Sequence, residues 1–479
     1  HGSFYEQEAK EKLQTSPPFK MTEKACFTAR GDLRTLARIS LPLMFYLFCE
    51  CLTLASERVF LSYYSLEAVQ GALSGLYLAA IFQLSTVAIA SMAQVFVGYY
   101  HGGGERIQIG PCVWQLIWFS LLSSLLVLPL SHLASLWYFK GTAIEQVGRE
   151  YFKVLSYGNF LFPLNAALTS FYLGRGKTVL VSIATITSYG LQLLLSWLLI
   201  FGVQGIIPPL GAQGAALGQC LSLGSLSLFF FFLLMRKSHR DCYQTNQWKL
   251  RPSALWGFIR PGLVRALNQF VIRLYWILYV SLILKKGGLY LDVLTVGGLV
   301  FAFFRFIIVG LLQAMLTITS NLLGKKSYHE LWRFFRSSSL YVGMISGLLF
   351  IVLIYFPNVL LCFFDPSSKA LFTQLFHKIN LSMWALLTLI FMQCCPLAAL
   401  TAMQDLKCQF YSTLFVSTVP FLSVYFGLKW DLLQPDQIWI VSVCEALIFA
   451  TVYSLRLRLN LATNKLDFLS RKVTPLKTN

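Results

Sequence analysis

Hydrophobic residues follow one another along this chain in long stretches that are separated by short polar segments. Each stretch holds the roughly 20 apolar residues that a helix needs to cross the hydrocarbon core of a bilayer. The predicted spans are residues 36–56, 72–98, 112–137, 152–173, 179–201, 213–235, 255–283, 293–322, 338–362, 372–403, 409–427 and 437–456. We therefore predict an all-α polytopic membrane protein with twelve transmembrane helices.

Composition supports this class, and the placement of charge adds an orientation. The chain is 56% hydrophobic and 12% charged, about half the charged share of an ordinary soluble domain. Its net charge of +19 would also suit a protein that binds nucleic acid. Of the 39 Lys and Arg residues, 27 belong to the tails and loops on the side of the termini, 9 to the opposite side and 3 to span interiors. This bias predicts cytoplasmic termini and accounts for the charge without nucleic acid.

The longest polar connection separates the first six predicted spans from the last six. The predicted organisation is a polar cytoplasmic tail at 1–35, an N-lobe at 36–235, a cytoplasmic linker at 236–254, a C-lobe at 255–457 and a basic cytoplasmic tail at 458–479. The first 35 residues have no apolar core, so we expect no cleavable signal peptide. Met21 is a candidate start, which would place residues 1–20 outside the native protein.

The two sets of six helices share landmarks at a nearly constant separation. Each set begins with a basic-flanked segment that contains a Pro, and its second and fifth helices end near a Gly. The paired positions, which lie 219 to 230 residues apart, are Pro42 and Pro261, Gly98 and Gly324, Lys177 and Lys407, and Gly202 and Gly427. Because each set begins on the same side of the membrane, the repeat is parallel, as in transporters whose site lies between two bundles.

Patterns typical of metal sites, disulfide frameworks and hydrolytic enzymes do not stand out in the sequence. Six of the 11 Cys lie within apolar runs, where Cys behaves as a small hydrophobic residue. The pairs Cys49–Cys51 and Cys394–Cys395 lack the spacing of zinc ligands. We therefore expect no metal site, no cofactor and no enzymatic activity.

Two acids in the first helix are candidates for ion binding, because ionisable groups inside a membrane span are costly and are functional by default. Glu50 and Glu57 are seven residues apart and so share one helix face. An acid withdrawn from water can exchange a proton near neutral pH or bind a cation. The competing interpretations are a buried acid paired with an Arg for Glu50, and a solvated acid at the helix end for Glu57. Glu445 in the last helix is a weaker candidate.

Basic and amide residues cluster on the seventh and eighth predicted helices. The seventh carries Arg265, Asn268, Gln269 and Arg273 along a similar face, and the eighth carries Arg305. Arg265 could extend to the membrane surface. The two deeper arginines are expected either to pair with Glu50 or Glu57 across a cleft or to face an anionic substrate.

Several stretches, taken in order, resemble the multidrug and toxic compound extrusion (MATE) family, within the superfamily of polysaccharide and lipid-linked oligosaccharide exporters. The resemblance covers nearly all of residues 33–457. Its segments are LARISLPLMF in the first helix, AQVFVGYYHGGGERIQ at 93–108, and LGRGKTVLVSIATITSYGLQLLLSWLLIFG followed by GAQGAALG within 173–218. The family implies twelve helices in two six-helix lobes around a cleft, and exchange of Na+ or H+ for organic, mostly cationic compounds.

The resemblance also implies roles for single residues. The acid that many members carry fifteen residues after the first-helix Pro is Glu57 here, and the Asn ten residues before the Gly that ends the fifth helix is Gln192. The acid that many members carry eight residues after the Pro of the seventh helix is the neutral Gln269, whereas Glu50 holds that position after Pro42. The cation machinery is therefore expected in the N-lobe, at Glu57 with Glu50.

The preferred hypothesis is an antiporter of the inner (plasma) membrane that exports a small organic or xenobiotic compound by alternating access. The coupling ion is H+ or Na+, with H+ favoured because one or two carboxylates suffice for it. The predicted substrate cleft comprises Gln192, Asn268, Gln269, Arg273 and Arg305. The arginines make that cleft basic, so the alternative is a flippase or exporter of an anionic or lipid-linked substrate.

Other classes fit less well. A transporter of the major facilitator type should carry a Gly-x-x-x-Asp-Arg motif in the loop that reads YYHGGGERIQIG here. A membrane enzyme would need a cluster of catalytic residues, which the sequence does not offer. We expect a monomer in the lipid bilayer that binds no nucleic acid.

Overall fold

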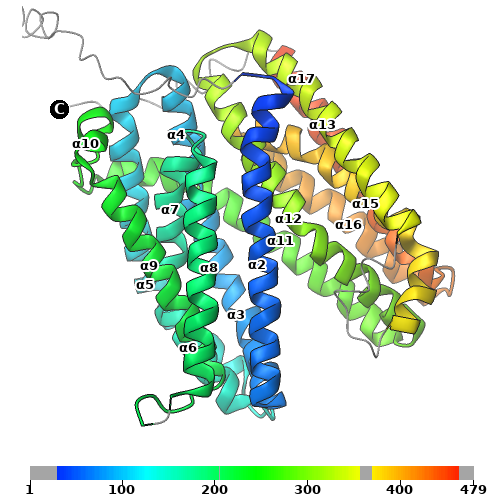
Figure 1. Ribbon diagram of the computed structural model, residues 1–479. Coiled ribbons are helices and arrows are strands. Elements are labelled where there is room, and N and C mark those ends of the chain that lie inside the picture. The colour runs from blue at the N-terminus through cyan, green and yellow to red at the C-terminus, as the bar shows by residue number, and fades with distance from the viewer. Residues whose placement is uncertain (1–29, 204, 357–368, 463–479) are drawn as a thin grey trace, which may run out of the picture.

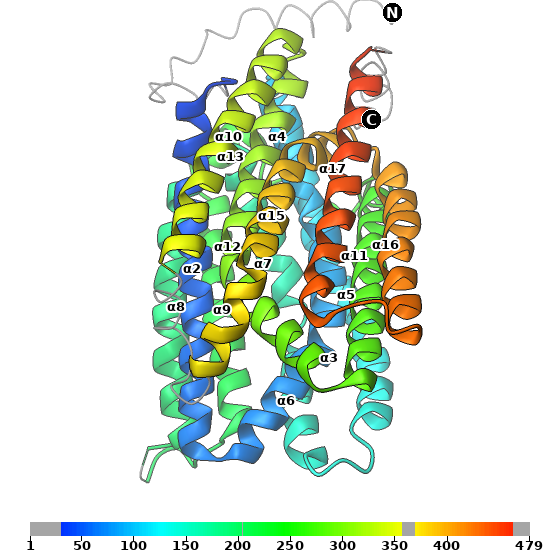
Figure 2. The same cartoon turned by 90° about the vertical axis from the view of Figure 1, so that its right-hand side faces the viewer.

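The computed structural model describes residues 30–203, 205–356 and 369–462, and this part of the chain is all-helical apart from its turns. Eleven helical segments within it are long and apolar enough to cross a membrane, and Leu161–Leu173 is a shorter apolar helix. The short helix and the one before it together form the remaining predicted span. The helices gather into two bundles that stand side by side (Figures 1 and 2). The predicted fold class, twelve membrane-spanning segments in two six-helix bundles, is confirmed.

The first bundle, called the N-lobe below, runs from α2 to α9. Its elements are α2 (Leu33–Tyr64), α3 (Leu66–Ala90), α4 (Met92–Gly103), η1 (Arg106–Gln108), α5 (Ile109–Tyr138), α6 (Glu145–Tyr157), α7 (Leu161–Leu173), α8 (Thr178–Phe201) and α9 (Ala212–Leu234). Two predicted spans are interrupted, the second at Ser91 and the fourth at residues 158–160. At these points the backbone adopts tighter bonds between residues three apart, such as Leu161 N–H to Gly158 O at 3.0 Å.

The second bundle, called the C-lobe, follows a linker that contains α10 (Lys237–Tyr243). Its elements are α11 (Pro252–Lys286), α12 (Leu289–Gly324), α13 (Tyr328–Tyr355), α15 (Lys369–Ala402), α16 (Leu406–Lys429), η3 (Pro435–Gln437) and α17 (Ile438–Ala462). Pro252 opens α11, at the position where a helix tolerates the missing N–H. The span predicted at 338–362 is helical to Tyr355, and its last residues, 357–362, lie outside the described residues.

The lobes contact each other at the end of the molecule where the described chain begins, at α2, and ends, at α17 (Figure 2). Gly98 and Gly102 of α4 face α12, and a Cβ atom at Gly102 would lie only 2.0 Å from the carbonyl oxygen of Asn321. A Cβ atom at Gly324 would likewise lie 2.0 Å from the carbonyl oxygen of Tyr99. Small residues at such spacing let two membrane helices approach backbone to backbone. These glycines therefore seal the lobes together at this end.

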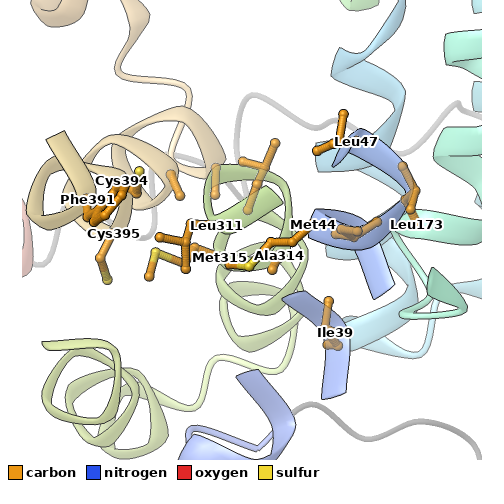
Figure 3. Close-up of a cluster of buried hydrophobic side chains, with 14 of the residues drawn as sticks. Ile39, Met44, Leu47, Leu173, Leu311, Ala314, Met315, Phe391, Cys394 and Cys395 are labelled. Carbon is orange, nitrogen blue, oxygen red and sulfur yellow. The ribbon is translucent and has the colours of Figure 1, made fainter. Parts of the chain in front are cut away.

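An apolar core continues through this contact. Figure 3 shows Met44 and Leu47 of α2 directed toward Leu311 and Ala314 of α12, on whose other side the α15 cluster with Phe391 lies. The hydrophobic cluster to which these residues belong spans both lobes. A second cluster, which includes Leu61 and Phe152, is built from N-lobe residues alone. The shared core therefore lies toward the termini, and α2 packs into its own lobe near its far end.

Polar bridges reinforce the contact. The Gln94 amide nitrogen donates to the backbone oxygen of Gln313 at 3.0 Å and to Thr317 Oγ1 at 2.8 Å. The Tyr46 hydroxyl donates to Gln313 Oε1 at 3.1 Å. Side chains that hydrogen-bond between membrane helices add about 0.6–2 kcal/mol each. Farther from the termini the lobes diverge, as the tilt of the C-lobe in Figure 1 shows.

Candidate functional site

Glu57 lies inside the N-lobe, where α2 packs against α8. Its side chain is only 8% exposed. The Gln192 amide nitrogen donates to Glu57 Oε1 at 2.9 Å, and the Ser196 hydroxyl donates to the same oxygen at 2.7 Å. Gln192 and Ser196 are four residues apart, so they project from one face of α8. Two of the three residues that the sequence singled out in this lobe, Glu57 and Gln192, are thus direct partners.

The arrangement leaves one side of the carboxylate available. Both donors converge on Oε1, and no described residue donates a hydrogen bond to Oε2. A carboxylate oxygen of this kind can take up a proton or contribute to a cation site. Within the described residues there is no group of three or more His, Cys, Asp or Glu side chains that could hold a metal ion. The chemistry available is therefore that of a single acid flanked by an amide and a hydroxyl.

Glu50 occupies a different environment two turns away on the same helix. It is half-buried, and the charge of Arg305 from α12 attracts it across the lobe boundary. The described residues nevertheless contain no ion pair between these side chains within 4.0 Å. Tyr46 and Tyr189 lie close enough to Glu50 for an electrostatic interaction with its carboxylate. Glu50 therefore faces the junction between the lobes, whereas Glu57 faces the N-lobe interior.

The predicted cleft residues of the C-lobe lie partly together. Arg273 of α11 and Arg305 of α12 are close enough for their charges to repel each other. Arg305 is exposed, Arg273 and Gln269 are half-buried, and Asn268 is buried. Neither Arg273 Nε nor Asn268 Oδ1 has a hydrogen-bond partner among the described residues. The two arginines therefore form a local cationic group, and only Glu50 of the two first-helix acids is near it.

Arg265 takes part in the lobe contact. Its Nη1 donates to Ser91 Oγ at 3.0 Å, at the break between α3 and α4. One Arg of the seventh predicted helix thus anchors the C-lobe to the N-lobe.

Two polar contacts were not anticipated from the sequence. Ser196 completes the Glu57 site, and its position one turn after Gln192 was the available signal. In the C-lobe, the Ser417 hydroxyl donates to Glu445 Oε1 at 2.8 Å, between α16 and α17. Ser417 stands ten residues before Gly427, as Gln192 stands ten residues before Gly202. Each lobe therefore contains one acid bonded from the equivalent position of its fifth helix.

Comparison with known proteins identifies the family. The MatE family model matches residues 42–198 and 265–426, which is about two thirds of the chain and includes parts of both lobes. This protein belongs to the MATE family. Its members are membrane transporters rather than enzymes, so the chain is a multi-pass transporter.

Relatives of this MATE protein include both a curated sequence and solved structures. It is 23% identical over 262 residues to the "Probable multidrug resistance protein NorM" of Thermotoga maritima, and the match covers 53% of this chain and 55% of the relative. The chain thus spans about half the length of that curated relative. An outward-facing multidrug resistance MATE family transporter superposes with a TM-score of 0.80 at 19% identity, over 93% of this chain and 100% of the other.

A second structural relative is a MOP superfamily transporter from Pyrococcus furiosus, described as having a binding pocket of reverse polarity. It superposes with a TM-score of 0.77 at 19% identity, over 94% of this chain and 100% of the other. At this level of identity the likeness establishes the MATE fold.

Proposed function

We propose that this MATE protein is a secondary transporter that exchanges a cation for a small organic compound, with Glu57 as the coupling acid. The observation that carries the proposal is the buried Glu57 carboxylate, held at Oε1 by two donors and open at Oε2. A charged acid inside a membrane bundle is costly, so binding of a cation or proton relieves that cost. Binding at Oε2 neutralises α2 at a point where the helix packs against α8.

A proton is the favoured coupling ion. A sodium ion prefers several oxygen ligands, whereas a proton needs one carboxylate oxygen. The Glu57 site offers one acid, and its two neighbours act as donors to it. Glu50 serves as a second acid on the same helix, at the lobe junction.

The proposed transport cycle is alternating access in the inner membrane with both termini in the cytoplasm. The positive-inside bias of the loops supports this orientation. In this orientation the contact sealed by Gly102 and Gly324 lies on the cytoplasmic side. Neutralisation of Glu57 lets the N-lobe helices rearrange, and the lobes rock about the site between them. Small organic substrates, including xenobiotics, are proposed because the T. maritima relative is named as a multidrug resistance protein.

The test is uptake of a fluorescent organic cation by everted membrane vesicles that are given either a pH gradient or a Na+ gradient. Glu57→Gln keeps the shape of the side chain and fixes it in a neutral form, so we expect gradient-driven uptake to fall to the level of empty vesicles. Glu67→Gln, at the exposed start of α3, removes the same charge and should leave uptake intact. Unchanged uptake by the Glu57→Gln protein would refute the assignment, and the gradient that drives uptake identifies the ion.

A second candidate function is export of an anionic or lipid-linked compound. The adjacent Arg273 and Arg305 support it, since their combined charge disfavours a cationic substrate and favours an anionic one. Arg273→Gln combined with Arg305→Gln should then abolish movement of an anionic fluorescent compound, whereas Arg58→Gln at an exposed position of α2 should not. If the double variant still moves the anionic compound at the normal rate, this candidate is wrong.

A further inference from the structure

A large pocket is lined by helices of the C-lobe. Its volume is about 1070 Å³, which is at the upper end of the range for small-molecule sites. It is lined by α11, α16, α17 and the turn between α15 and α16. All these elements belong to the C-lobe, and the lining residues lie near the end of the molecule that carries the termini. We call it the C-lobe pocket.

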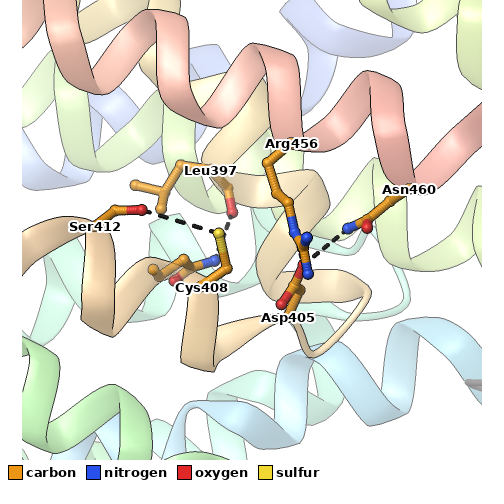
Figure 4. A network of polar contacts seen from close by, with 7 residues as sticks. Leu397, Asp405, Cys408, Ser412, Arg456 and Asn460 are labelled. Carbon is orange, nitrogen blue, oxygen red and sulfur yellow. Dashed lines mark hydrogen bonds and ion pairs between the residues drawn. The ribbon is translucent and has the colours of Figure 1, made fainter.

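The pocket presents more positive than negative charge. Arg260, Lys407 and Arg456 line it together with a single acid, Asp405. That acid is already engaged, because Arg456 Nε donates to Asp405 Oδ2 at 2.7 Å and Asn460 Nδ2 donates to the same oxygen at 2.9 Å (Figure 4). Arg260 and Lys407 form no ion pair with any described residue. Two cations are therefore left to attract an anion.

The rest of the lining is mostly apolar. Pro261 and Val264 of α11 lie across from Phe415 and Val416 of α16. The Phe415 ring is 69% exposed, which is costly unless an apolar partner or lipid covers it. A small hydrophilic anion would satisfy the cations and leave this surface uncovered. A ligand with an anionic head and an apolar chain would cover both.

The matching corner of the N-lobe is filled by the protein itself. There the turn residue Arg175 is 1% exposed, and its guanidinium lies 3.9 Å from the ring centre of Phe171 and 4.6 Å from that of Tyr243. Tyr243 comes from α10 in the linker, which closes this corner of the N-lobe. In the C-lobe, Asp405 holds the turn position that Arg175 holds in the N-lobe. Asp405 is not enclosed by aromatic rings, and it lines the C-lobe pocket.

We propose that the C-lobe pocket binds an anionic amphiphile, with its phosphate group on Arg260 and Lys407 and its acyl chain against Pro261, Val264 and Phe415. Basic pockets between membrane helices are recognised sites for anionic lipid headgroups, and Arg and Lys are the usual phosphate ligands. The site is separate from Glu57 and from the arginines at the lobe junction. The proposal therefore does not rest on the proposed transport function.

Native mass spectrometry of the purified full-length protein in a neutral detergent would count bound lipids. The probes are phosphatidylglycerol, phosphatidylcholine, and inorganic phosphate as a competitor. We expect phosphatidylglycerol to bind more tightly than phosphatidylcholine and to resist millimolar phosphate. Arg260→Gln combined with Lys407→Gln should weaken phosphatidylglycerol binding about tenfold or more. Lys237→Gln combined with Arg336→Gln removes two exposed cations outside the pocket and should leave binding unchanged.

A second pair of variants tests the cavity rather than its charge. Gly257 lines the pocket, and a Cβ atom there would meet no atom within 4 Å. Gly257→Leu should fill the cavity and weaken lipid binding several-fold, whereas Gly343→Leu, at an equally open site on α13, should not. Equal binding by the parent and both pocket variants would overturn the proposal. The proposal would also be overturned if Lys237→Gln combined with Arg336→Gln weakened binding equally. Full displacement of the lipid by phosphate would overturn it too, because it would indicate a site for a small anion.

Discussion

Glu57 projects from the first helix of the N-lobe toward α8, whereas Glu445 projects from the last helix of the C-lobe toward α16. Both acids accept a hydrogen bond from equivalent positions of a fifth helix, Gln192 and Ser417. The N-lobe acid has two donors and is buried, and the C-lobe acid has one donor and is half-buried. Two bundles of the same architecture thus carry their acids on different helices, the first helix in the N-lobe and the last helix in the C-lobe.

The two lobes therefore share the position of the hydrogen-bond donor on the fifth helix, but they do not share the position of the acid that it binds. In the C-lobe the residue eight after the helix Pro is Gln269, and the acid is supplied by α17 instead. The arginines of α11 and α12 belong to the C-lobe side of the junction. Under the proposed function, the N-lobe therefore carries the coupling acid and the C-lobe carries the charged part of the substrate cleft. Four substitutions, or pairs of substitutions, can break or sharpen this division.

The largest effect should come from replacing each acid in turn by its amide. Glu57→Gln should reduce gradient-driven uptake in vesicles to background, because the buried group can no longer change its charge. Glu445→Gln makes the same chemical change in the C-lobe and should reduce uptake by no more than about twofold, since its acid is half-buried with a single donor. If the two variants lose uptake equally, the lobes share the coupling role and the division fails.

A smaller effect is expected from a matched pair of serines. Ser196→Ala removes a donor to Glu57, and Ser417→Ala removes a donor to Glu445. A hydrogen bond to a charged group contributes about 1.5–3 kcal/mol, so the first substitution should change cation or proton affinity about tenfold or more. The second should leave that affinity unaltered. Uptake measured against pH, or against Na+ concentration, would detect the change as a shift of the half-maximal point.

Substrate uptake at saturating gradient provides the control for this pair. Both serine variants should reach a normal maximal rate, because neither substitution removes an acid. A loss of maximal rate in Ser417→Ala alone would instead place the critical acid in the C-lobe.

Much of this contrast could be predicted from the sequence, because it follows from periodic spacing. The twelve apolar stretches follow from helix length in a bilayer. The resemblance to the MATE family marked Glu57 and Gln192 by their distances from Pro42 and Gly202, although it did not predict that the two side chains meet. Ser196 was not singled out, since Ser is common in apolar membrane helices and its position one turn after Gln192 was the one signal available. The bond between Ser417 and Glu445 depends on how α16 and α17 pack, which spacing alone does not fix.

Long-range packing explains the other omissions. The cage around Arg175 needs Tyr243, which stands 68 residues later in the linker. The turn Gly174-Arg175-Gly176 does not indicate, by its sequence, that an aromatic ring from the linker will cover the Arg. The break at Ser91 is likewise not marked by a Pro in the sequence, whereas Pro163 lacks the N–H that would bond to Asn159 and so favours the break at residues 158–160.

The free energy of unfolding provides a further comparison between the lobes, at the matching turn residues Arg175 and Asp405. Arg175→Ala removes the cation from its aromatic cage and leaves a cavity, so we expect a loss of about 2 kcal/mol of unfolding free energy. Thermal unfolding in detergent, followed by intrinsic fluorescence, should show a midpoint lower by several degrees. Arg175→Met fills the same space without a buried charge and should stay within about 1 kcal/mol of the parent. Equal losses in the two variants would show that the charge, not the packing, holds the turn.

The smallest effect should appear at Asp405, the turn residue of the C-lobe. Burial alone would raise the pKa of Asp405, but hydrogen bonds from Arg456 and Asn460 outweigh it and hold the pKa below its ordinary value of 3.8. Arg456 is partly exposed, so the pair should contribute only about 0.5–1 kcal/mol. Asp405→Asn should therefore lower the thermal midpoint by about 1–2 °C at pH 7.

The pH dependence of that difference tests its origin. An acid whose pKa is lowered by folding stabilises the fold above its unfolded pKa, and this stabilisation disappears as the pH falls through the lowered folded value. The gap between the parent and Asp405→Asn should therefore be constant from pH 7 to about pH 5 and should close below about pH 4. Asp436→Asn, at η3, is a matched control, because Asp436 forms no ion pair with any described residue, and it should show no such gap. A gap that persists at low pH would mean that Asp405 acts by packing rather than by charge, and that the C-lobe turn resembles the N-lobe turn at Arg175 more than the ion pair suggests.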